Sequence, residues 1–125
     1  MNGRRSIPPG LTAELLLDVF DLPISFHRCL VPITGGVTAA LMLSQAIWTS
    51  EALDPEVGGW FCRSQEEWTE ETGLSRWEQE TARRALRSGG FLEERRAGMP
   101  AKLWFRVRPE AVGRALQAQA NPVRR

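Results

Sequence analysis

The sequence predicts an α+β domain that is mainly helical, with one short central strand and a β-hairpin toward the C-terminus. Three observations carry this prediction. Two Ser-x-x-Glu capping sequences, beginning at Ser64 and Ser75, flank a turn at Gly73 and indicate two consecutive short helices. A Gly-bounded aromatic run at 60–63 is typical of a short strand. After the second helix, two strand-like runs are separated by turn residues at 97–100, which indicates a hairpin.

Length and composition set the class of protein. The chain has 125 residues, of which 42% are hydrophobic and 25% charged, and this balance is typical of one globular domain with its own core. The two cysteines form no Cys-x-x-Cys pair, and there is one histidine, so a disulfide framework and a four-cysteine or histidine-rich metal site are excluded. The longest apolar run, 37–48, is far short of the ~18 residues of a membrane span. With no visible signal peptide, we expect a soluble, cytoplasmic protein that does not contact membranes.

The segment before Gly35 is divided into an arm and an extension. Residues 1–10, rich in Gly, Pro and Arg, are predicted to form a flexible basic arm. Residues 11–36 are predicted to form a helical extension that is a candidate dimer contact. Its expected elements are a helix over 11–20, a short strand over 24–26 and a helical turn over 27–33.

A central buried helix is predicted over 37–49. Its expected buried stripe consists of Val37, Ala40, Leu41, Ser44, Ile47 and Trp48. We also expect Trp48, Trp60 and Phe61 in the core, Cys29 and Cys62 as unreactive core thiols, and His27 in a structural role.

The second half of the chain follows the helix-turn-helix pattern. A helix over 65–72 ends at Gly73, and a second helix runs from Ser75 to Ser88. Strands are expected over 91–96 and 102–107, with Leu103, Phe105 and Val107 on one face. Pro109 begins a last helix, and residues 118–125 are predicted to be a flexible polar tail.

This order of elements resembles a known family. The motifs that carry the resemblance are Ala39 to Gln45, Gly59-Trp60-Phe61, Glu70 to Arg76, Gln79 to Arg83, and Pro100 to Leu103. They are similar to the winged helix-turn-helix proteins of plasmids and phages that are described as replication-associated, and to the DNA-binding domains of replisome organisers and initiators. The resemblance implies a winged-helix domain over 37–117 whose hairpin is the wing.

In a helix-turn-helix, the second helix enters the major groove of DNA. Near its start, the side chains expected to meet base edges are Arg76, Trp77, Glu80 and Thr81. Arg84 is a candidate for bases or phosphates, and Arg83 and Arg87 are candidates for phosphates. At the hairpin, Arg95, Arg96 and Lys102 would reach the backbone or the minor groove. Trp104 and Met99 are candidates for a protein interface.

The charge distribution leaves an alternative open. Residues 51–75 carry seven acidic side chains and one basic one, a balance of −6, whereas residues 76–108 carry nine basic and four acidic ones, a balance of +5. The basic half favours a nucleic-acid surface. The arginines of the second helix could instead form a solvated face paired with Glu80 and Glu94, and Arg95 and Arg96 could be ordinary edge charges.

Two functions from different classes remain. The first is double-stranded DNA binding, as a homodimer, by a transcriptional regulator or a plasmid or phage replication accessory. The second is a protein-binding module on the same scaffold, such as an inhibitor or adaptor of a host or replication complex, which the acidic 51–71 stretch and the aromatics Trp77 and Trp104 favour. We expect no enzyme, cofactor or metal, because the sequence holds no nucleophile–base set, paired carboxylates, metal-ligand motif or phosphate-binding loop.

Overall fold

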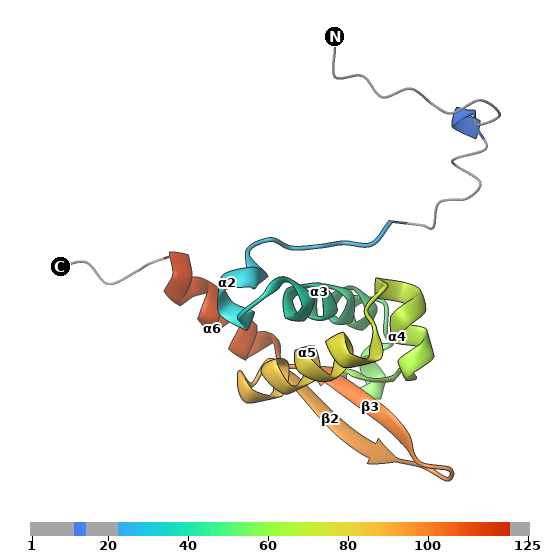
Figure 1. The fold of residues 1–125 in the computed structure, drawn as a ribbon. Coiled ribbons are helices and arrows are strands. Elements are labelled where there is room, and N and C mark those ends of the chain that lie inside the picture. The colour runs from blue at the N-terminus through green and yellow to red at the C-terminus, as the bar shows by residue number, and fades with distance from the viewer. Residues whose placement is uncertain (1–11, 15–22, 121–125) are drawn as a thin grey trace.

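Helices form one side of the molecule and a three-stranded sheet forms the other (Figure 1). This computed structural model describes residues 12–14 and 23–120. The elements are α2 (Leu30–Thr34), α3 (Val37–Glu51), the 3₁₀ turn η1 (Pro55–Val57), β1 (Trp60–Cys62), α4 (Gln65–Thr72), α5 (Arg76–Ser88), β2 (Leu92–Ala97), β3 (Lys102–Val107) and α6 (Pro109–Ala120). The predicted class, α+β and mainly helical with a small sheet, is confirmed.

The sheet is antiparallel, in the order β1-β3-β2. Phe61 of β1 lies opposite Phe105 of β3, which lies opposite Glu94 of β2. Because side chains alternate along a strand, the predicted row of Leu103, Phe105 and Val107 faces the helices. We call this side the inner face of the sheet, and the opposite side the outer face.

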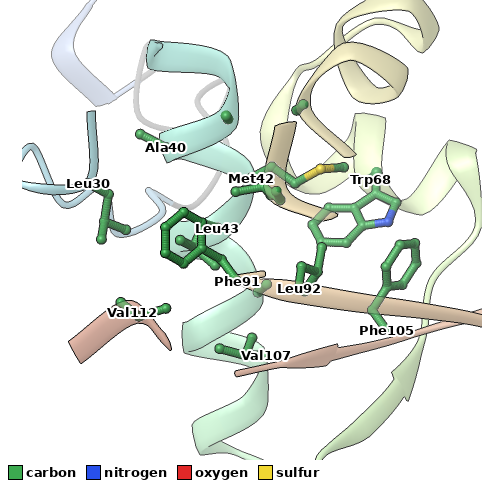
Figure 2. Close-up of a cluster of buried hydrophobic side chains, with 14 of the residues drawn as sticks. Leu30, Ala40, Met42, Leu43, Trp68, Phe91, Leu92, Phe105, Val107 and Val112 are labelled. Carbon is green, nitrogen blue, oxygen red and sulfur yellow. The ribbon is translucent and has the colours of Figure 1, made fainter. Parts of the chain in front are cut away.

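The core is built around Trp68 of α4 and Phe105 of β3, both fully buried (Figure 2). Their rings meet edge to face, with centroids 5.4 Å apart, and Phe61 lies 5.9 Å from Phe105. Two residues of α3 extend this core: Met42 lies beside Trp68, and Leu43 lies beside Phe91. The sheet and the α4–α5 pair therefore share one core.

The predicted buried stripe of α3 is wrong at both ends. Val37 is 60% exposed and Trp48 is 56% exposed. The fully buried hydrophobic residues are Ala39, Ala40, Met42, Leu43 and Ala46. Apolar residues occupy 39–43 without a break, so the sequence does not single out a face, and packing against α5 and the sheet decides it.

The N-terminal extension also differs from prediction. Residues 24–26 form no strand, and the short helix α2 begins only at Leu30. The segment 23–29 instead lies along α3, where the backbone N–H of His27 donates to the Ser44 hydroxyl at 3.0 Å, so it reaches no strand edge (Figure 1). The predicted arm 1–10 and most of the helix predicted over 11–20 lie outside the described residues.

Three smaller expectations are also corrected. Cys29 is exposed and Cys62 is half-buried, so neither thiol lies in the core. Trp60 is half-buried on the outer face of the sheet, because it neighbours the inward-facing Phe61 on the same strand. At the other end of the chain, α6 continues to Ala120, into the segment that the sequence assigned to a tail.

Candidate nucleic-acid interface

Local sequence signals position α4 and α5. Both helices carry complete capping boxes: the Ser75 hydroxyl accepts the backbone N–H of Glu78, and the Glu78 carboxylate accepts the N–H of Ser75 at 2.9 Å. Gly73 ends α4 at φ +79°, a left-handed conformation that favours glycine. The turn between the helices is therefore short and fixed by the sequence itself.

Gln79 joins the two helices from inside. It is 2% exposed, and its Nε2 lies within hydrogen-bond distance of three oxygens. These are the Gln65 carbonyl (3.1 Å), the Thr69 hydroxyl (2.9 Å) and the Leu74 carbonyl (3.0 Å). The angle between α4 and α5 is thus held by a buried polar network as well as by apolar packing.

The outward face of α5 carries four of the predicted base-reading side chains. Trp77 is 71% exposed, and Arg76, Glu80 and Arg84 are also exposed, whereas Thr81 is half-buried. Arg76 and Glu80 form a solvated pair at 3.8 Å. Within residues 12–14 and 23–120, Arg84 takes part in no ion pair.

Arg83 and Arg87, the predicted phosphate candidates, form ion pairs within the protein. Both bind the Glu94 carboxylate on the inner face of β2, at 2.8 Å each. Arg83 also donates through Nε to Glu94 at 2.9 Å, which makes the contact bidentate. The alternative of paired arginines therefore holds for Arg76, Arg83 and Arg87, and Arg84 is the exception.

The Glu94 clamp shifts the ionisation of its members. Burial raises the pKa of Glu94, but hydrogen bonds and positive charge from Arg83 and Arg87 outweigh it and leave the pKa below its ordinary value. The hydrogen bond from Arg83 to Glu94 raises the pKa of Arg83. The carboxylate therefore stays ionised at neutral pH and fastens α5 to the hairpin.

A cleft lies between α5 and the hairpin. Its volume is about 450 Å³, and its lining includes Arg76 and Glu80 from α5, Ser64 at the start of α4, and Arg96 and Lys102 from the hairpin. Within the described part of the chain, neither Arg96 nor Lys102 forms an ion pair. The structure thus brings the start of α5 and two of the three predicted hairpin cations to one opening.

Arg95, the third hairpin cation, lies on the outer face. Its guanidinium stands 4.4 Å from the centre of the Trp60 ring, and that of Arg106 stands 4.8 Å away from the same ring. Glu93 holds Arg106 at 2.6 Å and Arg108 at 3.0 Å, and these bonds lower the pKa of Glu93. This stack was missed at the sequence level, although strand alternation about Phe61 and Phe105 would have put Trp60 and Arg106 together.

The two candidates for a protein interface differ in exposure. Met99, at the hairpin tip, is 98% exposed. Trp104 is half-buried on the outer face, opposite Cys62 and Arg95. Only Met99 is thus freely presented to a partner.

Several acidic side chains of 51–71 have structural partners. Asp54 caps η1, Glu67 completes the capping box of α4, and Glu71 binds Arg63 at 2.8 Å. The hydrogen bond from the Ser64 backbone lowers the pKa of Glu67. Among the described residues, the exposed carboxylates of this stretch that form no ion pair or hydrogen bond are those of Glu51, Glu56, Glu66 and Glu70.

The described residues show neither a metal site nor a membrane-spanning helix. In the described ranges, no group of three or more His, Cys, Asp or Glu side chains could hold a metal ion. None of the helices described is long and apolar enough to cross a membrane. Comparison with protein-family models, curated proteins and solved structures finds no match to this chain.

Proposed function

We propose that this protein binds double-stranded DNA as a winged helix-turn-helix, with α5 in the major groove and the β2–β3 hairpin as the wing. The observation that carries the proposal is the cleft between α5 and the hairpin. Arg96 and Lys102, which form no ion pair with any described residue, line this cleft, and it adjoins the exposed face of α5. On that face the guanidinium group of Arg84 lies exposed in addition to that of Arg76, and Arg binds guanine and phosphate bidentately.

The acidic residues limit how the duplex would approach. Glu66 and Glu70 are exposed on α4, so contact through the middle of that helix would repel phosphates. Contact through α5 and the hairpin avoids them. This footprint suits a transcriptional regulator or a plasmid or phage replication accessory equally.

We also propose that the protein acts as a homodimer. Ile24, Phe26 and Trp48 are large apolar side chains that are 36%, 41% and 56% exposed, and we call them the apolar patch. Ile24 and Trp48 line one small pocket. Segment 23–29, which carries Ile24 and Phe26, runs along α3 on the side away from the hairpin (Figure 1). Exposed apolar surface of this kind marks association sites, and this one leaves α5 uncovered.

Fluorescence anisotropy with labelled mixed-sequence duplex tests the DNA proposal. We expect binding that weakens steeply between low and physiological salt, because phosphate contacts release counterions. Arg84→Ala should weaken binding by about 1–3 kcal/mol. The matched control is Arg114→Ala, which removes an exposed arginine from α6 and should leave affinity unchanged.

Absence of duplex binding by the wild-type protein at low salt would refute the proposal. Equal losses in Arg84→Ala and Arg114→Ala would show a nonspecific charge effect rather than a site on α5. Either result would shift the weight to the second candidate function.

That second candidate is a protein-binding module on the same scaffold. The observation that favours it is the exposure of Trp77 and Met99 together with the unpartnered Glu66 and Glu70. Its partner would be a host or replication protein. Under this function, Trp77→Ala and Glu70→Ala would reduce capture of that protein, and Arg84→Ala would not.

A further inference from the structure

The tip of the hairpin differs chemically from its flanks. Residues 98–101, Gly-Met-Pro-Ala, carry no charge, and the Met99 side chain is 98% exposed at the end of the hairpin. Arg95 and Arg96 come before the tip, and Lys102 follows it. A tip that bound only phosphates would be expected to carry a cation or a hydrogen-bond donor where Met99 stands.

Cations lie on both faces of the hairpin just behind this tip. Strand alternation puts Arg96 on the inner face, where it lines the cleft beside α5, and Arg95 on the outer face, where it stacks on Trp60. In the described part of the chain neither forms an ion pair. Stacking on the Trp60 ring limits the motion of the Arg95 guanidinium, while the N–H groups at the edge of that guanidinium stay available to an anion.

This arrangement matches the cross-section of a DNA minor groove. The groove is narrow, about 6 Å wide, and has a phosphate strand along each side. Cations on the two faces of an inserted hairpin would each meet one strand. An apolar tip would meet the floor of the groove, where proteins insert Met, Leu or Pro side chains against base steps that unstack easily.

We propose that Met99 is an apolar wedge that the hairpin places in the minor groove at a deformable, A·T-rich step. The inference rests on the proposed function and adds a second reading site to that of α5. The unbranched thioether of methionine adapts to an irregular surface better than a branched side chain does. Selectivity would arise because the exocyclic amino group of guanine obstructs the groove floor and because TA steps are flexible.

Three duplexes of equal length test the wedge with the full chain. Their central tracts are A·T with TA steps, G·C, and inosine·C, which presents the major groove of G·C with a minor groove that lacks the amino group. We expect the wild-type protein to bind the A·T and inosine·C duplexes about tenfold more tightly than the G·C duplex. Doubly labelled duplexes should report a bend in the same two cases.

Met99→Ala should abolish this preference and the bend while leaving the salt dependence unchanged, since no charge is removed. Met99→Lys should also abolish the preference. Arg84→Ala is the matched control, and it should weaken binding to all three duplexes without changing their order. Because the Met99 side chain is almost fully exposed, Met99→Ala and Met99→Lys should both keep the wild-type thermal midpoint.

Two results would overturn the wedge alone: a preference that persists in Met99→Ala, or a Met99→Lys variant that binds all three duplexes more tightly than wild type. The second result would identify the tip as a phosphate contact. If the wild-type protein binds none of the duplexes, the proposed function fails and the wedge fails with it, so the two failures are distinguishable.

Discussion

Glu94 is a single side chain on which the placement of α5 depends. Its carboxylate is 7% exposed and accepts from Arg83 and Arg87, which come from a different element. Removing it leaves two guanidinium groups without their partner in a partly desolvated place. The hairpin and the face of α5 that carries Arg84 would then lose their common anchor.

We therefore expect Glu94→Gln to lower the free energy of unfolding by about 2 kcal/mol, as measured by urea denaturation at pH 7. The matched control is Glu110→Gln, which removes a carboxylate from an exposed pair with Arg108 at 3.6 Å. That change should cost less than about 0.5 kcal/mol. Similar losses for both variants would show that the clamp adds nothing beyond a surface pair.

The contribution of Glu94 to the stability of the folded protein depends on pH. The pKa of Glu94 is lower in the folded protein than in the unfolded chain, so its contribution is fully present above the unfolded pKa. It is lost as the pH falls through the lower, folded pKa. The difference in stability between wild type and Glu94→Gln should thus shrink in acid, and a constant difference from pH 7 to pH 3 would contradict this assignment.

At the scale of the elements, the glycine that ends α5 and a glycine inside α6 differ in what a methyl group would do. Gly89 follows the helix at an ordinary negative φ, so backbone preference alone would favour alanine there. However, an added Cβ would lie 2.5 Å from Cε2 of the buried Phe91 ring. Gly113 lies inside α6 with open space around it.

Gly89→Ala should therefore destabilise the protein by about 1–3 kcal/mol, because the Phe91 ring has to move. Gly113→Ala should stabilise it by about 0.5–1 kcal/mol, through better helix propensity. Thermal unfolding of the two variants measures both effects. A stabilising Gly89→Ala would show that the ring accommodates the methyl group without strain.

Element by element, local signals decided what the sequence could predict. The capping boxes at Ser64 and Ser75 predicted α4 and α5 to within one residue, and alternation predicted β3, because each signal lies within a few positions of the chain. The buried face of α3 depends on partners distant in sequence, so its apolar residues alone were ambiguous. The Glu94 clamp joins residues seven and eleven positions apart across two elements, and neither helical nor strand periodicity reports such a contact.

The features of the candidate site also fall into those that local spacing predicts and those that depend on distant residues. The exposure of Arg76, Trp77 and Arg84 on α5 followed from helical spacing about the inward-facing Ala82 and Leu86. The pairing of Arg83 did not follow, because it needs the hairpin to fold back over α5. Charge counts along the chain cannot separate a free cation from one that a remote carboxylate holds.

For the whole molecule, the apolar patch determines the expected assembly. If two copies associate through Ile24, Phe26 and Trp48, then Trp48→Glu should convert the dimer to a monomer at micromolar concentration, because a buried unpaired carboxylate is costly. Light scattering after size-exclusion chromatography measures the mass. The control, Trp77→Glu, changes an indole on α5 that is 71% exposed, against 56% for Trp48, and should leave the dimer intact.

A wild-type protein that is monomeric throughout this range would refute the dimer. Loss of the dimer in Trp77→Glu alone would instead move the interface to α5 and conflict with duplex binding by that helix. The experiment therefore also tests whether association and recognition use separate faces.

The buried amide of Gln79 has a mechanical consequence. Because Gln79 lies on α5 and its Nε2 contacts both α4 and the turn, we expect the angle between the two helices to change little when another molecule binds. Where the shapes of the two surfaces differ, the other molecule would then have to deform. If this pair binds DNA as proposed, it would select by the flexibility of its target: a flexible duplex would be bent to fit, and a rigid one of the wrong shape would be released.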